Sequence, residues 1–350
     1  MELLLIAFGL GLGTVGLVLV VRGLIAEPPP PPPVPPAKIN DGTTYREPSG
    51  RSWGLVALGV LFGVVGGAIG LLGVVVHGLS SLSTSSKGRL LRVRGRARLP
   101  AVARGDGWHD DAAPDTAALS IVERAVMAQA WLYSARMEHA SIPAFALLAQ
   151  HLTALGAPSP LVERTLRAGL DELRHARRCF ALARAYGGRD WTAGPIAELT
   201  RPEPDTGAGP VDVVRLAMGS LIDGAVPEAI AAEVARAGSR RTVDPVVRAT
   251  LTMIAHDERA HAELAWDVVA WCHARDPRRV GAALAERAAR LDQELAPRVP
   301  PIPGIAPARL AELGLLDSDA VGALAAAVIA DAQHRLRALV APGVAAARAA

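Results

Sequence analysis

Two short clusters of acidic and histidine residues could do chemistry in this sequence. They are Asp171-Glu172-Leu173-Arg174-His175 and Asp257-Glu258-Arg259-Ala260-His261, and both have the pattern Asp-Glu-x-x-His. On an α-helix, residues three apart leave the same face about one turn apart, so the Glu and the His of each cluster can bind one metal ion together. Divalent transition metals accept carboxylate oxygen and imidazole nitrogen as ligands. The two clusters therefore predict a metal site between two helices.

Two further glutamates extend this pattern. Glu138 lies 34 residues before Glu172, and Glu228 lies 30 residues before Glu258. At about 1.5 Å per residue, each spacing allows half a helix, a short loop and a returning half-helix. The sequence thus predicts a repeated pair of helices in which each of four helices contributes a carboxylate to a two-metal site.

The third helix offers a choice of glutamate. Glu233 is the alternative to Glu228, but five residues of helix rotate a side chain by about 140°, so both cannot point at one centre. The spacing favours Glu228. Its neighbour Pro227 is expected to kink or bulge the helix, as is Pro143 just beyond Glu138, because proline removes a helical N–H group.

The order Glu, Glu-x-x-His, Glu, Glu-x-x-His resembles that of the ferritin-like di-iron carboxylate superfamily. Residues 135–145 and 169–180 also resemble segments of bacterial proteins described only as containing a ferritin-like domain. The resemblance covers residues 116–295 and implies an all-α fold, a ferritin-like antiparallel four-helix bundle. It implies two Fe ions as cofactors, with Mn as the alternative metal. The metal ligands that it implies are Glu138, Glu172, His175, Glu228, Glu258 and His261.

The same resemblance gives Asp171 and Asp257 a supporting role. Each aspartate would accept the free ring N–H of the histidine on the opposite helix, which fixes the tautomer and strengthens the ligand. No catalytic residue is predicted beyond the metal ligands. His139 lies about 100° around the helix from Glu138, so we expect a helix contact or a surface position for it.

A site of this kind predicts an oxidoreductase that activates O2 or peroxide, either an oxidase or a hydroxylase. The alternative is a ferroxidase that binds and oxidises iron without an organic substrate, and a third possibility is a scaffold without turnover. Ala231 stands where rubrerythrin-like peroxidases carry another glutamate, which weakens a peroxidase assignment. Cys179 and Cys272 form no Cys-x-x-Cys pair for an additional iron centre, and we expect them to be small buried side chains.

The N-terminal part of the chain predicts a membrane anchor. Residues 3–21 and 53–76 are uncharged apolar runs long enough to cross a bilayer. We therefore expect a transmembrane helix in residues 1–22, a Pro-rich loop in 23–52, a second transmembrane helix in 53–78 and a basic juxtamembrane linker in 79–115. The excess of basic residues after the second run predicts a two-pass protein of the inner (cytoplasmic) membrane, with both termini and the ferritin-like domain in the cytoplasm.

The basic linker also bears on partners. It adjoins the second apolar run and lacks interleaved aromatic residues, which favours membrane lipid over nucleic acid as its partner. Gly59, Gly63 and Gly67 recur every four residues, a spacing that allows close helix packing and a homodimer. An oxidoreductase also needs an electron donor, which the sequence does not identify.

Periodicity and breaker residues set the expected helices. The bundle helices are predicted at residues 117–154, 159–186, 211–237 and 243–273, with a long crossover at 187–209 and a further helix at 277–295. A C-terminal helical extension, residues 296–350, is expected to hold helices at 308–314 and 318–340.

Overall fold

The computed structural model describes residues 89–93, 96–200, 211–295, 302 and 305–341. The chain divides into two compact units, residues 1–78 and 79–350, and all the described residues belong to the second. The predicted Pro-rich loop lies outside them.

In the part of the chain that the structure describes, no helix combines the length and the apolar composition needed to cross a membrane. The long helices carry charged residues along their length, such as Arg136 and Glu138. This finding contradicts the predicted two-pass location in the inner membrane with cytoplasmic termini. The apolar runs on which that prediction rested, residues 3–21 and 53–76, lie outside the described residues.

The described unit is mostly helical, as the sequence predicted, and its helices follow the expected order. Their bounds are α3 Ile121–Ala154, α4 Ser159–Gly187, α5 Val213–Ser220, a π-helical turn Leu221–Ala225, α6 Val226–Arg241, α7 Pro245–Arg275, α8 Pro277–Ala288, α9 Leu291–Leu295, α10 Pro307–Glu312 and α11 Ser318–Val340. A short 3-10 helix, Ala197–Thr200, lies between α4 and α5.

Side-chain caps explain where several helices begin. Ser120 and Glu123 form a capping box at the start of α3, each side chain bonding the backbone of the other residue. Asp244, Asp276 and Asp317 each accept backbone N–H groups at the first turns of α7, α8 and α11. These contacts satisfy helix N–H groups that have no partner within the helix.

Short strands attach the predicted linker to the helices. Strand β1 (Arg92–Val93) pairs with β2 (Arg96–Ala97), and β3 (Val102–Arg104) pairs antiparallel with β4 (Trp191–Ala193) of the crossover. None of these strands was expected from the sequence. They are two or three residues long, which is too short for a period-two pattern to be visible.

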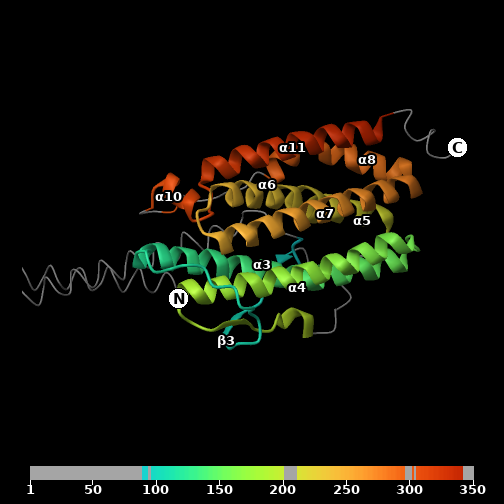
Figure 1. Ribbon diagram of the computed structural model, residues 1–350. Helices are drawn as coiled ribbons and strands as arrows, with labels where there is room; N and C mark the ends of the chain where they lie inside the picture. Colours follow the sequence, from blue (N-terminus) through green and yellow to red (C-terminus); the bar gives the residue numbers. More distant parts are fainter. Residues whose placement is uncertain (1–88, 94–95, 201–210, 296–301, 303–304, 342–350) are drawn as a thin grey trace, which may run out of the picture. The chain divides into compact units, whose positions relative to one another are not determined.

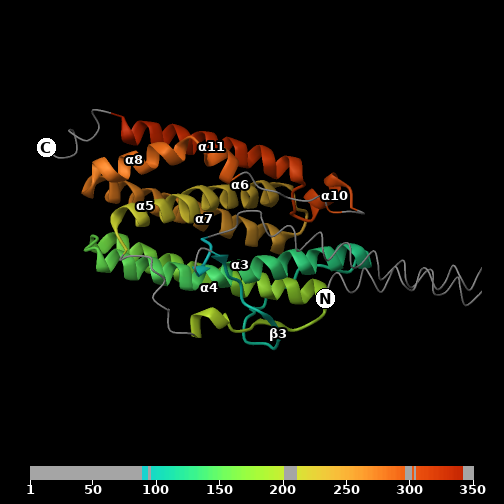
Figure 2. The same cartoon turned by 180° about the vertical axis from the view of Figure 1, so that it is seen from behind.

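The helices pack in pairs (Figures 1 and 2). Helices α3 and α4, joined by residues 155–158, lie against each other along their lengths, and α7 packs against α5, the π turn and α6. The two pairs meet through α4 and α7, while α11 packs on α6, α8 and α9. The C-terminal helices therefore cover the second pair.

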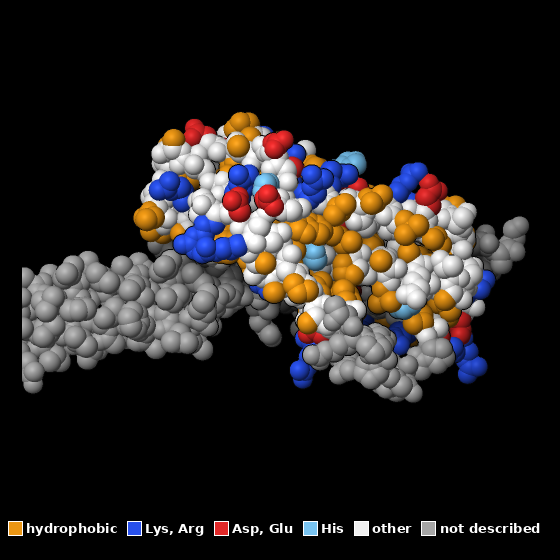
Figure 3. Space-filling view, turned by 90° about the horizontal axis from the view of Figure 1, so that it is seen from below, with side chains coloured by type: hydrophobic (Ala, Val, Ile, Leu, Met, Phe, Trp, Pro, Cys, Tyr) orange, Lys and Arg blue, Asp and Glu red, His pale blue; other side chains and the backbone are white. Residues whose placement is uncertain are grey.

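Hydrophobic and charged side chains share the surface on the α4 and β3 side of Figure 1, which Figure 3 views from below. On α4, Leu166 and Leu170 are 55% and 64% exposed. Exposed leucines in this number are ordinary for a folded protein. The glutamates and histidines of the two sequence clusters lie in the interior.

Candidate metal centre

The structure brings together all six residues predicted as ligands. Glu138 comes from α3, Glu172 and His175 from α4, Glu228 from α6, and Glu258 and His261 from α7. None of the six is more than 3% exposed. They form two groups that could each hold a metal ion, and within each group the ligand atoms lie within 4.8 Å of one another. One group is Glu138, Glu172, His175 and Glu258; the other is Glu172, Glu228, Glu258 and His261.

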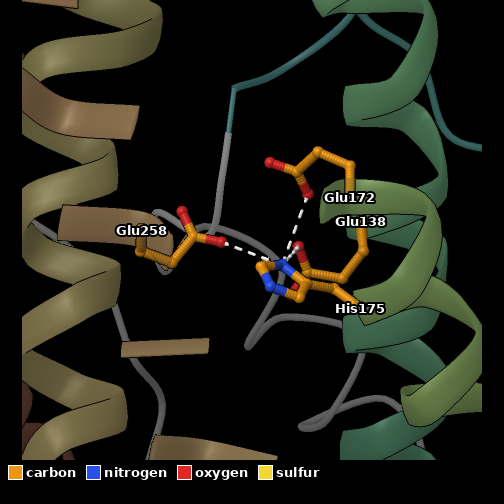
Figure 4. Close-up of side chains that lie close together, drawn as sticks. All are labelled: Glu138, Glu172, His175 and Glu258. Carbon is orange, nitrogen blue, oxygen red and sulfur yellow. Dashed lines mark ion pairs between the residues drawn. The ribbon is translucent and has the colours of Figure 1, made fainter. Parts of the chain in front are cut away.

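Two glutamates belong to both groups, and each directs one oxygen to each histidine. Glu172 Oε2 lies 3.8 Å from His175 Nδ1, and its Oε1 lies 3.3 Å from His261 Nδ1. Glu258 Oε1 lies 3.5 Å from His175 Nδ1, and its Oε2 lies 3.8 Å from His261 Nδ1. Figure 4 shows the group around His175, with side chains from α3, α4 and α7 converging on its ring. This geometry allows Glu172 and Glu258 to be shared between two cations.

The polar atoms at the centre of the cluster lack hydrogen-bond partners. These buried atoms are Glu138 Oε2, both carboxylate oxygens of Glu172, Glu228 and Glu258, and Nδ1 of His175 and of His261. A buried polar atom without a partner costs on the order of 1–3 kcal/mol, and more if it is charged. A concentration of such atoms at one point is compatible with a site whose missing partners are cations, and it is compatible with a di-iron site in particular.

Hydrogen bonds from the far side fix both histidine rings. His175 Nε2 donates to Asp257 Oδ2 at 2.9 Å, and His261 Nε2 donates to Asp171 Oδ2 at 3.3 Å. Each histidine thus bonds an aspartate of the opposite helix. Because a carboxylate only accepts, Nε2 of each ring carries a proton, and Nδ1 faces the cluster.

One arginine links the two aspartates. Arg174 Nη2 donates to Asp171 Oδ1 at 2.9 Å and to Asp257 Oδ2 at 2.7 Å. Arg174 could not be singled out from the sequence, because an arginine in a helix rich in arginine carries no distinguishing signal. The structure shows that it can hold both histidine–aspartate pairs in place.

The electrostatics of the cluster favour protons or cations at its centre. Burial raises the pKa of Glu138 and of Glu228 well above the usual value, and neighbouring carboxylates add to the rise. Burial alone would lower the pKa of His175, but the bond to Asp257 and the nearby glutamates raise it to about 10. Metal ions would take the place of these protons.

Two hydrophobic clusters enclose the site along the helix axes. On α3, Met127 and Trp131 belong to one cluster and Leu148 and Leu152 to the other, and Glu138 lies between them. The same holds on α7, where the first cluster ends at Ile254 and the second begins at Leu264. The packed side chains at both ends help to bury the polar centre.

The expected helix irregularity is present beside Pro227. A π turn, Leu221–Ala225, ends two residues before Pro227 and three before Glu228, whereas α3 continues as an α-helix through Pro143. Inserted π turns often occur at functional sites, where they re-aim the residues that follow.

Other candidate residues lie outside the cluster. Glu233 pairs with Arg236 and Arg259 and is not among the grouped ligand atoms. His139 packs against Trp108, with ring centroids 4.5 Å apart. Cys179 and Cys272 are buried and form no disulfide among the described residues.

A comparison of the chain with protein-family models, with curated proteins and with solved structures found no match. The class that the structure defines is a mostly helical protein with a buried group of glutamate and histidine residues that could hold a metal ion.

Proposed function

We propose that this protein is a non-haem di-iron oxidoreductase that activates O2 or peroxide, built on a ferritin-like four-helix bundle. The observation that carries the proposal is the pair of overlapping ligand groups, whose buried carboxylate oxygens and imidazole nitrogens lack partners. Two groups that share Glu172 and Glu258 call for two cations close together. The four long helical segments that supply the ligands support the ferritin-like assignment.

Each residue then has a defined task. Glu138 and His175 would complete one metal position, Glu228 and His261 would complete the other, and Glu172 and Glu258 would serve both. Four carboxylates balance the charge of two divalent cations, which favours such ions inside a dry core. Iron is the proposed metal, and manganese is the alternative for the same ligands.

The metal ions would supply electrons to O2 or peroxide, and the protein would control access and geometry. The hydrophobic clusters on either side of the site exclude water. Asp171, Asp257 and Arg174 keep both imidazoles oriented, so that the ligands are already in place when a cation arrives.

A second candidate is iron oxidation without an organic substrate. The observation that favours it is the enclosure of the site, because ligands no more than 3% exposed suit small reactants such as Fe2+ and O2. In this version the same residues bind iron as a substrate.

Metal content tests the shared and unshared roles of the glutamates. We expect two metal ions per chain in the wild type. Glu172→Gln and Glu258→Gln should lose both ions, whereas Glu138→Gln and Glu228→Gln should retain one, because only the first pair serves both positions. Glu163→Gln, an exposed change on α4, is the matched control and should retain two. Equal metal content in all variants would contradict the proposed site.

Iron chemistry separates the two candidate functions. The protein is loaded with Fe2+ without oxygen and then mixed with O2, while iron oxidation and O2 consumption are followed. Oxidation that stops after two iron ions per chain and needs an added reductant to repeat supports the oxidoreductase. Continued oxidation of excess Fe2+ supports iron handling, and a lack of reaction contradicts both.

A further inference from the structure

Arg89 places a buried positive charge beside the candidate metal centre. The residue is 8% exposed although it lies in the basic segment before β1. Its carbonyl oxygen accepts a hydrogen bond from Ser141 Oγ of α3 at 2.9 Å, and its guanidinium carbon lies 5.5 Å from the centre of the Phe145 ring. Phe145 in turn contacts the His261 ring edge-on, with centroids 5.2 Å apart.

The π turn makes room for this guanidinium. A Cβ atom at Gly224 would lie 2.7 Å from Arg89 Nη2 and 2.9 Å from Ala265 Cβ, so a side chain at residue 224 would displace the guanidinium from its present position. The same π turn leads directly into α6 and Glu228. The turn therefore positions both a proposed metal ligand and a charged neighbour of that ligand.

Among the described residues, Arg89 contacts the Phe145 ring but forms no direct pair with a carboxylate. Its Nε is buried without a hydrogen bond, and no carboxylate of the described residues forms an ion pair with it. Asp223, the acidic residue of the π turn, forms an ion pair with Arg92, with 2.6 Å between Asp223 Oδ1 and Arg92 Nε. The carboxylates that act on Arg89 through space are those of Glu228, Asp223 and Glu172, and burial lowers its pKa.

With metal bound, the cations would neutralise the negative charges of the cluster. Four glutamates balance two divalent cations, so the positive charge of Arg89 would remain. A buried unpaired charge is costly, and a compensating anion removes the cost. The planar guanidinium matches two oxygen atoms of a carboxylate or a phosphate, which makes arginine the usual side chain for binding such groups.

We propose that Arg89 binds an oxyanion, a carboxylate or phosphate group, beside the metal centre. This inference rests on the proposed function and names its substrate class, a small molecule that carries such a group. The anion would occupy the Glu228 and His261 side of the site, because Arg89 contacts Phe145 and the π turn there.

Cobalt-loaded protein gives a test that does not depend on turnover. Co2+ binds the same ligand types, and its visible spectrum changes when its surroundings change. The loaded wild type is titrated with acetate, with inorganic phosphate and with neutral acetamide. We expect at least one of the two anions to bind and acetamide not to bind. Binding of acetate would indicate a carboxylate ligand, and binding of inorganic phosphate would indicate a phosphate ligand.

The variants decide the role of the guanidinium. Arg89→Gln should weaken anion binding at least about ten-fold, since it removes a charge-assisted hydrogen bond. Arg89→Lys should restore part of it, and Arg96→Gln, an exposed change in the same basic segment, should bind as the wild type does. If Arg89→Gln does not fold, Gly224→Ala takes its place, because the added Cβ displaces the guanidinium and keeps the charge.

The outcomes separate this inference from the function on which it rests. If Co2+ fails to bind the wild type, the proposed metal site is wrong and this inference fails with it. If Co2+ binds but acetamide binds as well as the anions, or Arg89→Gln binds the anions as the wild type does, only the inference about Arg89 is overturned.

Discussion

A single arginine couples the two histidines of the candidate site. Arg174 bonds Asp171 and Asp257, and each of these aspartates holds a histidine from the opposite helix. The other cluster has Ala260 at the corresponding position, so this link exists once. One exposed guanidinium therefore links the two aspartates that hold the imidazoles.

Removal of that guanidinium is expected to weaken metal binding at both positions. Arg174→Gln should lower metal affinity about 10- to 100-fold, because both aspartates lose a bond that fixes them against the histidines. Isothermal titration with Co2+ or Zn2+ measures the effect.

The other Asp-Glu-x-x-His cluster supplies the matched control. Arg259 pairs with Glu233 and contacts neither aspartate among the bonds described, so Arg259→Gln should bind metal as the wild type does. Equal losses in Arg174→Gln and Arg259→Gln would mean that Arg174 acts only through the general surface charge.

The sequence predicted the convergence of six side chains, since helical spacing places Glu and His one turn apart. It did not predict Arg174 or Arg89. Their roles depend on which helix faces which and on a glycine in the π turn, and neither fact can be seen in a local pattern. At the residue scale, ligand types and their spacing can be predicted from the sequence, while charge contacts between distant segments cannot.

At the scale of elements, glycine and proline residues predicted several helix ends correctly. Helix α4 ends at Gly187 and is followed by Gly188 in a left-handed conformation, as the paired glycines predicted. Helix α11 runs from Ser318 to Val340, the predicted bounds. The predicted helix at 277–295 is split into α8 and α9, and the third bundle helix contains the π turn. The π turn packs against α7, and α8 and α9 pack against α11.

The packing of the C-terminal helices depends on a close backbone approach at α6. A Cβ atom on Gly238 would lie 2.6 Å from the carbonyl oxygen of Gly314, which follows α10. Gly238→Ala should therefore lower the free energy of unfolding by about 1–3 kcal/mol, because backbone must move to admit the methyl group.

A glycine in α11 provides the comparison. Nothing lies within 4 Å of a Cβ atom at Gly322, so Gly322→Ala should raise the free energy of unfolding by about 0.5–1 kcal/mol through helix propensity alone. Urea denaturation of both variants measures the difference. A stabilised Gly238→Ala variant would show that α10 does not pack on α6 in this way.

At the scale of the whole molecule, two hydrophobic clusters lie on either side of a polar centre. Burial of its unpartnered polar atoms is unfavourable without cations. The hydrophobic periodicity of the sequence predicted a helical domain around this centre. The predicted membrane location did not hold for the described residues. A fold that encloses unpartnered carboxylates must gain stability when cations bind, since only the folded chain assembles the site.

The same reasoning predicts how pH affects the metal-free protein. The pKa values of Glu138 and Glu228 are raised above 4.5 by burial and neighbouring carboxylates, so the folded chain holds protons there that the unfolded chain has released. For His175, the bond to Asp257 and the nearby glutamates outweigh burial and raise the pKa from 6.5 to about 10, so its contribution is complete below pH 6.5 and is lost as the pH rises through 10.

Both shifts act in the same direction between pH 5 and pH 9. The stability of the chelator-treated protein should fall as the pH rises, by at most about 1.4 kcal/mol per pH unit for each proton involved. Urea midpoints at pH 5, 7 and 9 measure this slope. Metal-loaded protein should lack it because cations replace the protons, and metal-free Glu228→Gln should show a shallower slope because one titrating group is gone. A midpoint of the metal-free protein that rises with pH would show that the carboxylates are not held together in a dry core.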